Sequence, residues 1–156
     1  MSINNELQLD RPMEDIRHEA VLNVVRTANV LSQKGASLFR KYDLTEAQFN
    51  VLFALKYKER DWTQSELSQR LVVTRASVTS VLDKLEEKAL VQRTSVVGNR
   101  RIYHVDLTSG GRALMEEVEP VYRDLIHGLL EGYTDGACSK LIGYLESIRK
   151  QVQASE

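Results

Sequence analysis

The stretch TRASVTSVLDKLEEKALVQR, residues 74–93, decides how this chain folds. Apolar residues recur in it at Val78, Val81, Leu82 and Leu85, the steps of three and four that give a helix one buried face. Most other positions before Leu85 carry small hydroxyl or basic side chains, and the final LVQR alternates as a β-strand does. The stretch therefore predicts a helix with one packed face and one small, polar, basic face, followed by a strand.

A shorter helix is predicted directly before it. In TQSEL, residues 63–67, Thr63 is a favourable N-cap and Glu66 completes a capping box. This helix should end near Leu71, and Thr74 can cap the helix that follows. Two helices joined by three or four residues, the second with a small polar outer face, are typical of a helix-turn-helix.

A β-hairpin is predicted after the second helix. The segments 90–95 and 102–107 both alternate as strands do, and VVGNRR between them contains a Gly-Asn pair typical of a hairpin turn. A hairpin in this position is a wing, and its tip carries Arg100 and Arg101.

Long helices are predicted on both sides of this region. Upstream, apolar residues recur at helical steps from Pro12, placed in the first turn, to Tyr42. The next helix should begin with Thr45 as N-cap and with Gln48 completing its capping box.

Downstream, Thr108 can cap one helix, and Gly132 and Thr134 should end it and begin the last. In the last helix, apolar residues recur from Cys138 to Val152 at the steps of a helix that packs along another helix. The terminal helices carry more apolar surface than a winged helix of roughly 70 residues can bury. A homodimer interface is the expected use of that surface.

These elements predict a mainly α protein with a small β-wing. The expected organisation is an N-terminal dimerisation region at 1–42, a winged helix-turn-helix at 43–112 and C-terminal dimerisation helices at 113–156. The segment 63–112 carries a net charge of +3 and the segment 113–156 a net charge of −4. A basic middle beside an acidic tail favours a domain that faces a polyanion such as nucleic acid.

Composition and motifs argue against several other classes. Of the 156 residues, 42% are apolar and 28% charged, the balance of a soluble globular protein. The opening residues are polar, and no apolar run approaches the roughly 20 residues of a membrane helix. A single cysteine, Cys138, allows no internal disulfide and suits the cytoplasm. No nucleophile elbow, phosphate-binding loop or HExxH occurs, so neither an enzyme nor a cofactor is expected.

Three stretches between Leu44 and about Leu114 resemble the MarR family of bacterial transcriptional regulators: LTEAQFNVLFAL, TQSELSQRLVVTRASVTSVLDKLEEKALVQR and NRRIYHVDLTSGGRAL. Their combined spacing is specific, although no piece is specific alone. The resemblance implies a homodimer that binds double-stranded DNA at a palindromic operator through one winged helix per subunit. Relatives commonly block promoters and often bind small organic anions, so a ligand-responsive repressor is expected.

The resemblance also implies which residues contact DNA. Residues of the longer, recognition helix would lie near the bases, those of the wing near the minor groove or its phosphates, and backbone N–H groups of the shorter helix would hold phosphates. The shorter helix contributes Thr63, Gln64 and Ser65, the recognition helix Thr74, Arg75, Ala76, Ser77, Thr79, Ser80 and Lys84, and the wing Asn99, Arg100 and Arg101.

Two positions depart from the family pattern. Asn99 stands where the family usually has aspartate, so an arginine beside it would be oriented by hydrogen bonding without a charge. Ala89 stands where glycine is usual after the recognition helix. If Ala89 adopts a left-handed conformation, the cost is on the order of 1 kcal/mol.

Plainer interpretations stand beside these. Arg75 and Lys84 could be solvated helix charges, and the two wing arginines could merely keep the hairpin soluble; the helix-turn-helix context favours DNA contact. The alternative function is a winged helix used for protein–protein contact, which predicts an apolar or acidic outer face on the second helix.

Cys138 could sense oxidants, but its place on an apolar helix face favours packing. The three histidines are scattered without HxxH or HxxxH spacing, so no metal site is expected.

Overall fold

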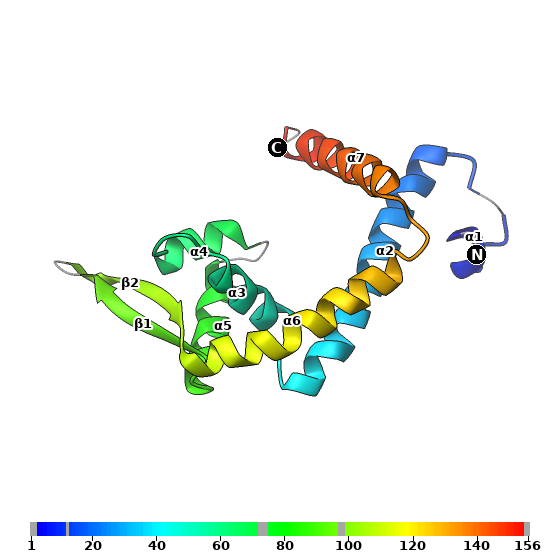
Figure 1. Ribbon diagram of the computed structural model, residues 1–156. Helices are drawn as coiled ribbons and strands as arrows, with labels where there is room; N and C mark the ends of the chain where they lie inside the picture. The colour runs from blue at the N-terminus through cyan, green and yellow to red at the C-terminus, as the bar shows by residue number, and fades with distance from the viewer. Residues whose placement is uncertain (1–2, 12, 72–74, 97–98, 155–156) are drawn as a thin grey trace. The chain divides into compact units, whose positions relative to one another are not determined.

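The computed structural model describes residues 3–11, 13–71, 75–96 and 99–154. The predicted mainly α fold with one small antiparallel sheet is confirmed (Figure 1). In chain order the elements are α1 (Ile3–Glu6), α2 (Ile16–Phe39), the 3₁₀ turn η1 (Arg40–Tyr42), α3 (Glu46–Lys56), α4 (Gln64–Arg70), α5 (Arg75–Glu87), β1 (Val91–Val96), β2 (Asn99–Leu107), α6 (Ser109–Leu129) and α7 (Asp135–Gln153). Contacts divide the chain into two compact units, Met1–Glu119 and Pro120–Glu156.

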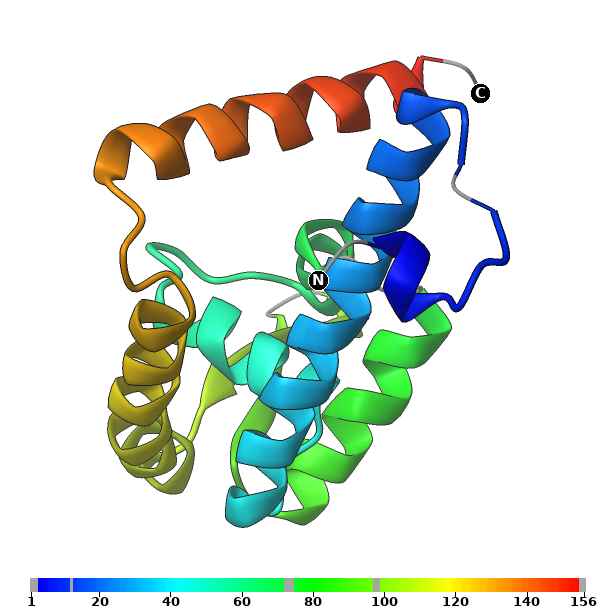
Figure 2. The ribbon, with the colours of Figure 1, turned by 90° about the vertical axis from the view of Figure 1, so that its right-hand side faces the viewer.

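The long first helix begins later than its apolar pattern predicted. The helix α2 starts at Ile16, where the Asp15 side chain accepts a hydrogen bond from the Arg17 backbone N–H at 2.9 Å. The predicted start near Pro12 was therefore wrong, and Pro12 itself lies outside the described residues. An aspartate N-cap satisfies a backbone donor that would otherwise lack a partner, and this decided the start. The helix α2 runs directly into η1, and residues 43–45 separate η1 from α3; Figure 2 shows the long α2 from the side.

The first unit has one apolar core around α3 and α5. The Phe39 and Phe49 rings stack with centroids 4.2 Å apart. Burying each such side chain contributes about 1.5–3 kcal/mol. The core is formed by residues from the end of α2 and the loop after it, from α3, α4, α5, the hairpin and α6. They include Phe39, Leu44, Phe49, Leu52, Leu55, Leu67, Val78, Leu82, Leu85, Val91, Val105, Leu107, Met115 and Val118.

A buried ion pair joins α3 to α6 at the end of this unit. Glu119 is 6% exposed, and Lys56 Nζ lies 2.6 Å from its Oε2. The Tyr57 hydroxyl donates a hydrogen bond to the other carboxylate oxygen. Because the buried carboxylate has both a cation and a neutral donor, its desolvation is compensated, and α6 is held against α3.

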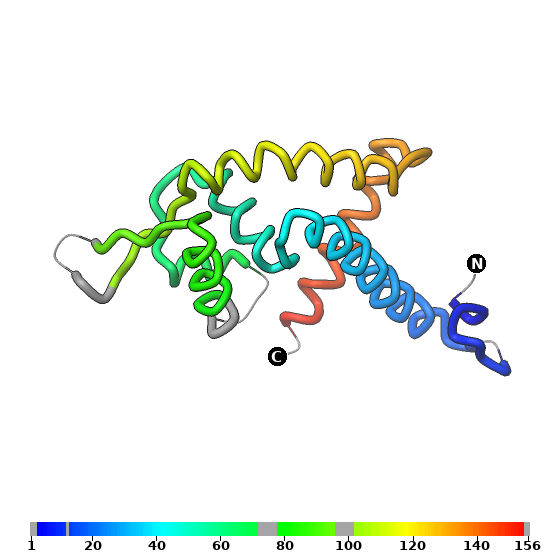
Figure 3. The backbone as a smooth tube through the Cα atoms, turned by 90° about the horizontal axis from the view of Figure 1, so that it is seen from below, coloured from blue at the N-terminus to red at the C-terminus, as the bar shows by residue number. Residues whose placement is uncertain are grey.

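The wing is a two-stranded hairpin whose strands reach further than predicted. Val96 and 99–101, which were predicted to lie in the turn, belong to the strands, so Arg100 and Arg101 are part of β2 and the prediction that they form the tip was wrong; residues 97–98 lie outside the described residues. The base of the hairpin gains a third partner because the Val105 backbone N–H donates to the Trp62 carbonyl at 3.1 Å. The strands project from the helices of this unit (Figure 3).

The turn after α5 has the left-handed conformation considered for Ala89, whose φ is 53°. The Ala89 N–H donates to the Glu86 carbonyl at 2.8 Å and the Leu90 N–H to the Leu85 carbonyl at 2.9 Å, which closes the helix. The Thr108 hydroxyl, which also caps α6 as predicted, donates to the Ala89 carbonyl at 2.6 Å. An alanine therefore occupies a backbone position that favours glycine.

In the second unit, the turn between α6 and α7 follows the prediction. Gly132 has a φ of 87°, and the Thr134 hydroxyl accepts a hydrogen bond from the Ala137 N–H at 3.2 Å. No residue of α7 is buried in the single chain, and Cys138 is half-buried. None of the described helices is long and apolar enough to cross a membrane.

Replacing Ala89 with glycine should raise the free energy of unfolding by about 0.5–1 kcal/mol, because glycine removes the left-handed strain. Urea denaturation, monitored by circular dichroism, measures this change in the free energy of unfolding. The matched control is Ala113→Gly within the exposed face of α6, which should lower stability by about 1 kcal/mol. If both variants lose stability equally, Ala89 carries no strain.

Candidate nucleic-acid interface

The helix α5 has the two faces that its sequence predicted. Val78, Leu82 and Leu85 are fully buried, whereas Thr79 and Ser80 are exposed. Three buried side chains at helical spacing fix the rotation of α5 about its axis. The exposed face is therefore set by the core and carries small hydroxyl side chains.

The predicted DNA-contacting residues at the start of α5 and at the wing are placed by backbone alone. The first turn of α5 includes 75–77, and β2 begins with 99–101, but the side chains of these residues lie outside the described part of the structure. Thr74 lies outside it altogether. Their contacts with DNA remain predictions.

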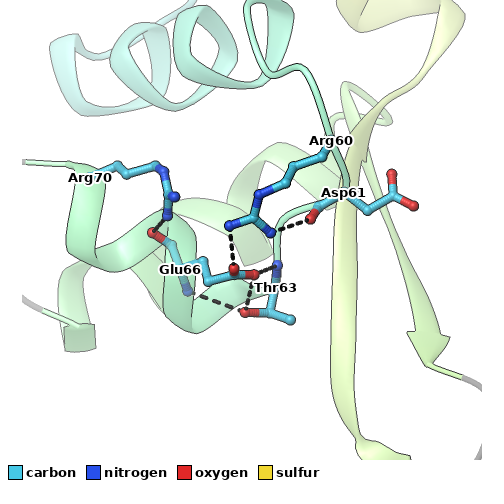
Figure 4. A network of polar contacts seen from close by, with 5 residues as sticks. All are labelled: Arg60, Asp61, Thr63, Glu66 and Arg70. Carbon is cyan, nitrogen blue, oxygen red and sulfur yellow. Dashed lines mark hydrogen bonds and ion pairs between the residues drawn. The ribbon is translucent and has the colours of Figure 1, made fainter.

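The start of α4 is held by the predicted capping box (Figure 4). The Thr63 N–H donates to Glu66 Oε2 at 2.9 Å, and the Glu66 N–H donates to the Thr63 hydroxyl at 3.2 Å. Arg60 Nη2 lies 2.8 Å from the other Glu66 oxygen. Since the Thr63 N–H is occupied by Glu66, only the N–H groups of Gln64 and Ser65 remain as predicted phosphate donors from this turn.

The capping box also changes the acidity of Glu66. The hydrogen bond from the Thr63 backbone, followed by that from Arg60, lowers the pKa of Glu66 from 4.5 to about 2. Both donors favour the carboxylate form. In the folded protein near neutral pH, Glu66 is therefore ionised, and the positive charge of Arg60 compensates its negative charge.

Two predicted site residues from different helices meet at the outer face. Gln64 Nε2 donates a hydrogen bond to Thr79 Oγ1 at 2.7 Å. This contact links the first residue of α4 to the exposed face of α5. The sequence separation of fifteen residues gave no indication of it.

Lys84 lies on a different flank of α5. It lines a cavity of about 540 Å³ together with Arg40 of η1, Glu87 and Lys88. Lys88 is itself paired with Asp43, at 2.8 Å from its carboxylate. The structure thus places Lys84 beside a groove of mixed charge, and its predicted DNA contact remains a prediction.

The prediction missed Arg93, which joins β1 to α5. Its guanidinium lies 2.7 Å from Asp83 Oδ1 and 2.6 Å from Glu86 Oε2, and the side chain is 16% exposed. Burial alone would lower the pKa of Arg93, but hydrogen bonds and charge from Asp83 and Glu86 outweigh it and raise the pKa. Arg93 therefore pairs with two carboxylates on α5 and offsets one of their two negative charges. Strand alternation marked its position, but nothing in the sequence indicated these partners.

Charged groups also fix the base of the wing. Lys58 Nζ lies 2.5 Å from Asp106 Oδ1 and donates to the Val105 carbonyl at 2.9 Å. Asp61 is 3.6 Å from the same ammonium group, and its other carboxylate oxygen lies 3.8 Å from the His104 ring. These contacts tie β2 to the loop before α4. No group of three or more His, Cys, Asp or Glu within the described ranges could hold a metal ion.

Because the pKa of Glu66 is lowered on folding, its contribution to stability should be complete above pH 4.5 and be lost as the pH falls toward 2. The difference in unfolding free energy between the parent and Glu66→Gln, measured by urea denaturation at several pH values, should shrink over that range. Glu117→Gln, an exposed change on α6, is the matched control. The pH series runs from about 6, above the usual carboxyl pKa range, down to the lowest pH at which both proteins fold. A difference between parent and variant that stays constant over this series would contradict the prediction.

Comparison with known proteins agrees with the resemblance seen in the sequence. The profile of the MarR family matches residues 42–102. YsmB, an uncharacterized HTH-type transcriptional regulator of Bacillus subtilis (strain 168), is 28% identical over 108 residues, which are 69% of this chain and 73% of YsmB.

Solved structures extend the likeness over most of the chain. Bordetella bronchiseptica BpsR, whose DNA binding is regulated by 6-hydroxynicotinic acid, aligns with a TM-score of 0.69 at 25% identity over 83% of this chain and 98% of BpsR. M. tuberculosis MOSR, solved in complex with DNA, aligns with a TM-score of 0.68 at 25% identity over 85% of this chain and 97% of MOSR. YsmB and MOSR are transcriptional regulators, and BpsR binds DNA. With the helix-turn-helix and wing in place, residues 42–102 match the MarR family, and the chain as a whole is similar to helix-turn-helix transcriptional regulators.

Proposed function

We propose that the protein is a homodimeric, sequence-specific repressor that binds a palindromic operator in the cytoplasm. The helix α5 enters the major groove, and the wing contacts the DNA alongside it. The observation that carries this proposal is the exposed face of α5, where Thr79 and Ser80 lie opposite the buried Val78 and Leu82, with the wing directly after the helix.

The side chains and charges of this face suit a groove. Small side chains allow the helix backbone to approach base edges, and arginine at residue 75 is the residue type best suited to paired hydrogen bonds with guanine. Asp83 and Glu86 would repel phosphates, but both pair with Arg93, at 2.7 and 2.6 Å, which offsets one of their two negative charges. The helix can therefore approach DNA without two uncompensated carboxylates.

The homodimer proposal is supported by apolar side chains that the single chain leaves exposed. On α2 they are Ile16, Val21, Val24, Val25, Val30 and Leu31, and on α7 they are Leu141, Ile142, Tyr144, Ile148 and Val152. Exposed apolar side chains gathered on one helix in this number are typical of a protein–protein interface in soluble proteins. A second copy of the chain supplies matching surface from the same helices. A dimer would place two recognition helices about 34 Å apart, one turn of DNA.

We further propose that a small organic anion regulates the protein. BpsR, which aligns with most of this chain, has its DNA binding regulated by 6-hydroxynicotinic acid. A ligand that binds better when the two recognition helices are wrongly spaced lowers operator affinity by shifting the population of dimers. No cofactor is needed for this mechanism.

The DNA-binding proposal predicts distinct losses for two arginines. Arg75→Ala should cost about 1–3 kcal/mol on the selected operator and relax the preference at one base position, whereas Arg101→Ala should weaken binding to most sequences and flatten the salt slope. Gel shifts at two salt concentrations, with an operator obtained by random-sequence selection, measure both. Lys34→Ala, on the exposed face of α2, is the control. If the parent selects no sequence, the protein is instead a winged-helix module for protein contact.

The dimer proposal predicts that Leu141→Glu, which places a charge on the apolar face of α7, gives a monomer with weakened operator binding. Burying an unpaired charge costs several kcal/mol, enough to dissociate a dimer at micromolar concentration. Analytical ultracentrifugation of the parent, Leu141→Glu and the neighbouring control Lys140→Glu measures the mass. A monomeric parent, or a dimeric Leu141→Glu, would show that this face is not the interface.

A further inference from the structure

We propose that Gln64 and Thr79 form one specificity element, in which Gln64 positions the Thr79 side chain so that its methyl group meets a thymine of the operator. The inference rests on the proposed function and goes beyond it, because it assigns Gln64 a role in base preference in place of a phosphate contact. The observation that carries it is the hydrogen bond from Gln64 Nε2 to Thr79 Oγ1 at 2.7 Å.

The backbone of Gln64 is fixed on both sides. It is the first residue of α4, directly after the N-cap Thr63, whose hydroxyl and N–H are both bound to Glu66. The Ser68 hydroxyl, almost buried, donates to the Gln64 carbonyl at 2.8 Å. The point from which the Gln64 side chain extends is therefore set, and only its rotamers are free to vary.

The backbone of Thr79 is fixed equally well. Val78 beside it and Leu82 in the next turn are fully buried, each with 0% of its surface exposed. They hold the rotation of α5, and this keeps Thr79 on the outer face. Because both partners start from fixed points, the hydrogen bond between them specifies how their side chains point.

The consequence is chemical, because threonine carries a hydroxyl and a methyl on the same carbon. In a helix its χ1 divides between two rotamers. A donor at 2.7 Å on the side of α4 favours the rotamer that turns Oγ1 toward Gln64. The same rotation fixes the methyl in a different direction, away from that donor.

This arrangement predicts which base is preferred. A threonine methyl in the major groove packs against the C5 methyl of thymine, whereas a threonine hydroxyl can contact any of several base edges. With Oγ1 turned toward Gln64 by this hydrogen bond, the methyl takes a fixed direction, and we expect the methyl to decide the preference. Without Gln64, the Thr79 rotamer loses its bias toward α4, and the preference is relaxed while the helix stays folded.

The test removes the thymine methyl alone. Deoxyuridine replaces each thymine of the selected operator in turn, and binding of the full-length protein is measured by gel shift. For the parent, one position in each half-site should weaken binding about fourfold, the equivalent of about 0.8 kcal/mol for one methyl group. Thr79→Ser, which keeps the hydroxyl, and Gln64→Met, which keeps the length of the side chain, should both lose the sensitivity at that same position. The double variant should lose no more than Thr79→Ser alone.

Gln69→Met, an exposed glutamine on the same helix, is the matched control and should keep the parent's sensitivity. Thermal unfolding confirms that each variant is folded. If Gln64→Met weakens all duplexes equally and lowers the salt slope, Gln64 is a phosphate contact and the inference is overturned. It is also overturned if the parent selects an operator but Gln64→Met keeps the parent's thymine sensitivity. A parent that selects no sequence overturns the proposed function itself, so the two failures are distinguishable.

Discussion

The junction between α5 and the wing is the contact on which the rest of the DNA-binding unit depends. The chain leaves α5 through the left-handed Ala89, and the Thr108 backbone N–H then donates to the Leu90 carbonyl at 3.1 Å. The same carbonyl lies against Gly111, where an added Cβ would be 2.0 Å away, so only glycine fits there. One turn thus joins the end of the recognition helix, the base of the hairpin and the start of α6. The angle between helix and wing is set by backbone contacts that leave no room for adjustment.

The charges near the outer face follow a second pattern. Glu66 is paired with Arg60, and Asp83 and Glu86 share Arg93, so these carboxylates have cations within 2.8 Å. Each pair also links separate segments: the loop before α4 to its first turn, and β1 to α5. Exposed pairs of this kind contribute little to stability. Their larger effect is on the surface potential, because they remove negative charge from helices that face a polyanion.

Much of the fold was predictable because its signals are local. A capping box needs two residues three apart, a two-faced helix needs apolar residues at steps of three and four, and a strand needs alternation. The starts at Thr45 and Thr63 and the buried face of α5 were therefore recovered from sequence. The start of α2 was missed because Pro12 was assigned to the first turn, whereas Asp15 caps the helix directly before the first apolar residue of the pattern. The length of the wing was missed because cross-strand pairing extends the strands past their alternating residues.

The sequence by itself determined the order of elements, the two-faced recognition helix, the caps and the resemblance to the MarR family, since each depends on neighbours within one turn or on a spaced motif. Only the tertiary structure decided which distant residues meet: Gln64 with Thr79, Arg93 with Asp83 and Glu86, and Lys84 with the groove beside Arg40. These contacts depend on how helices and strands pack, and one side chain can reach many partners. The pattern along a chain states which face is buried, but it does not state what the other face will touch.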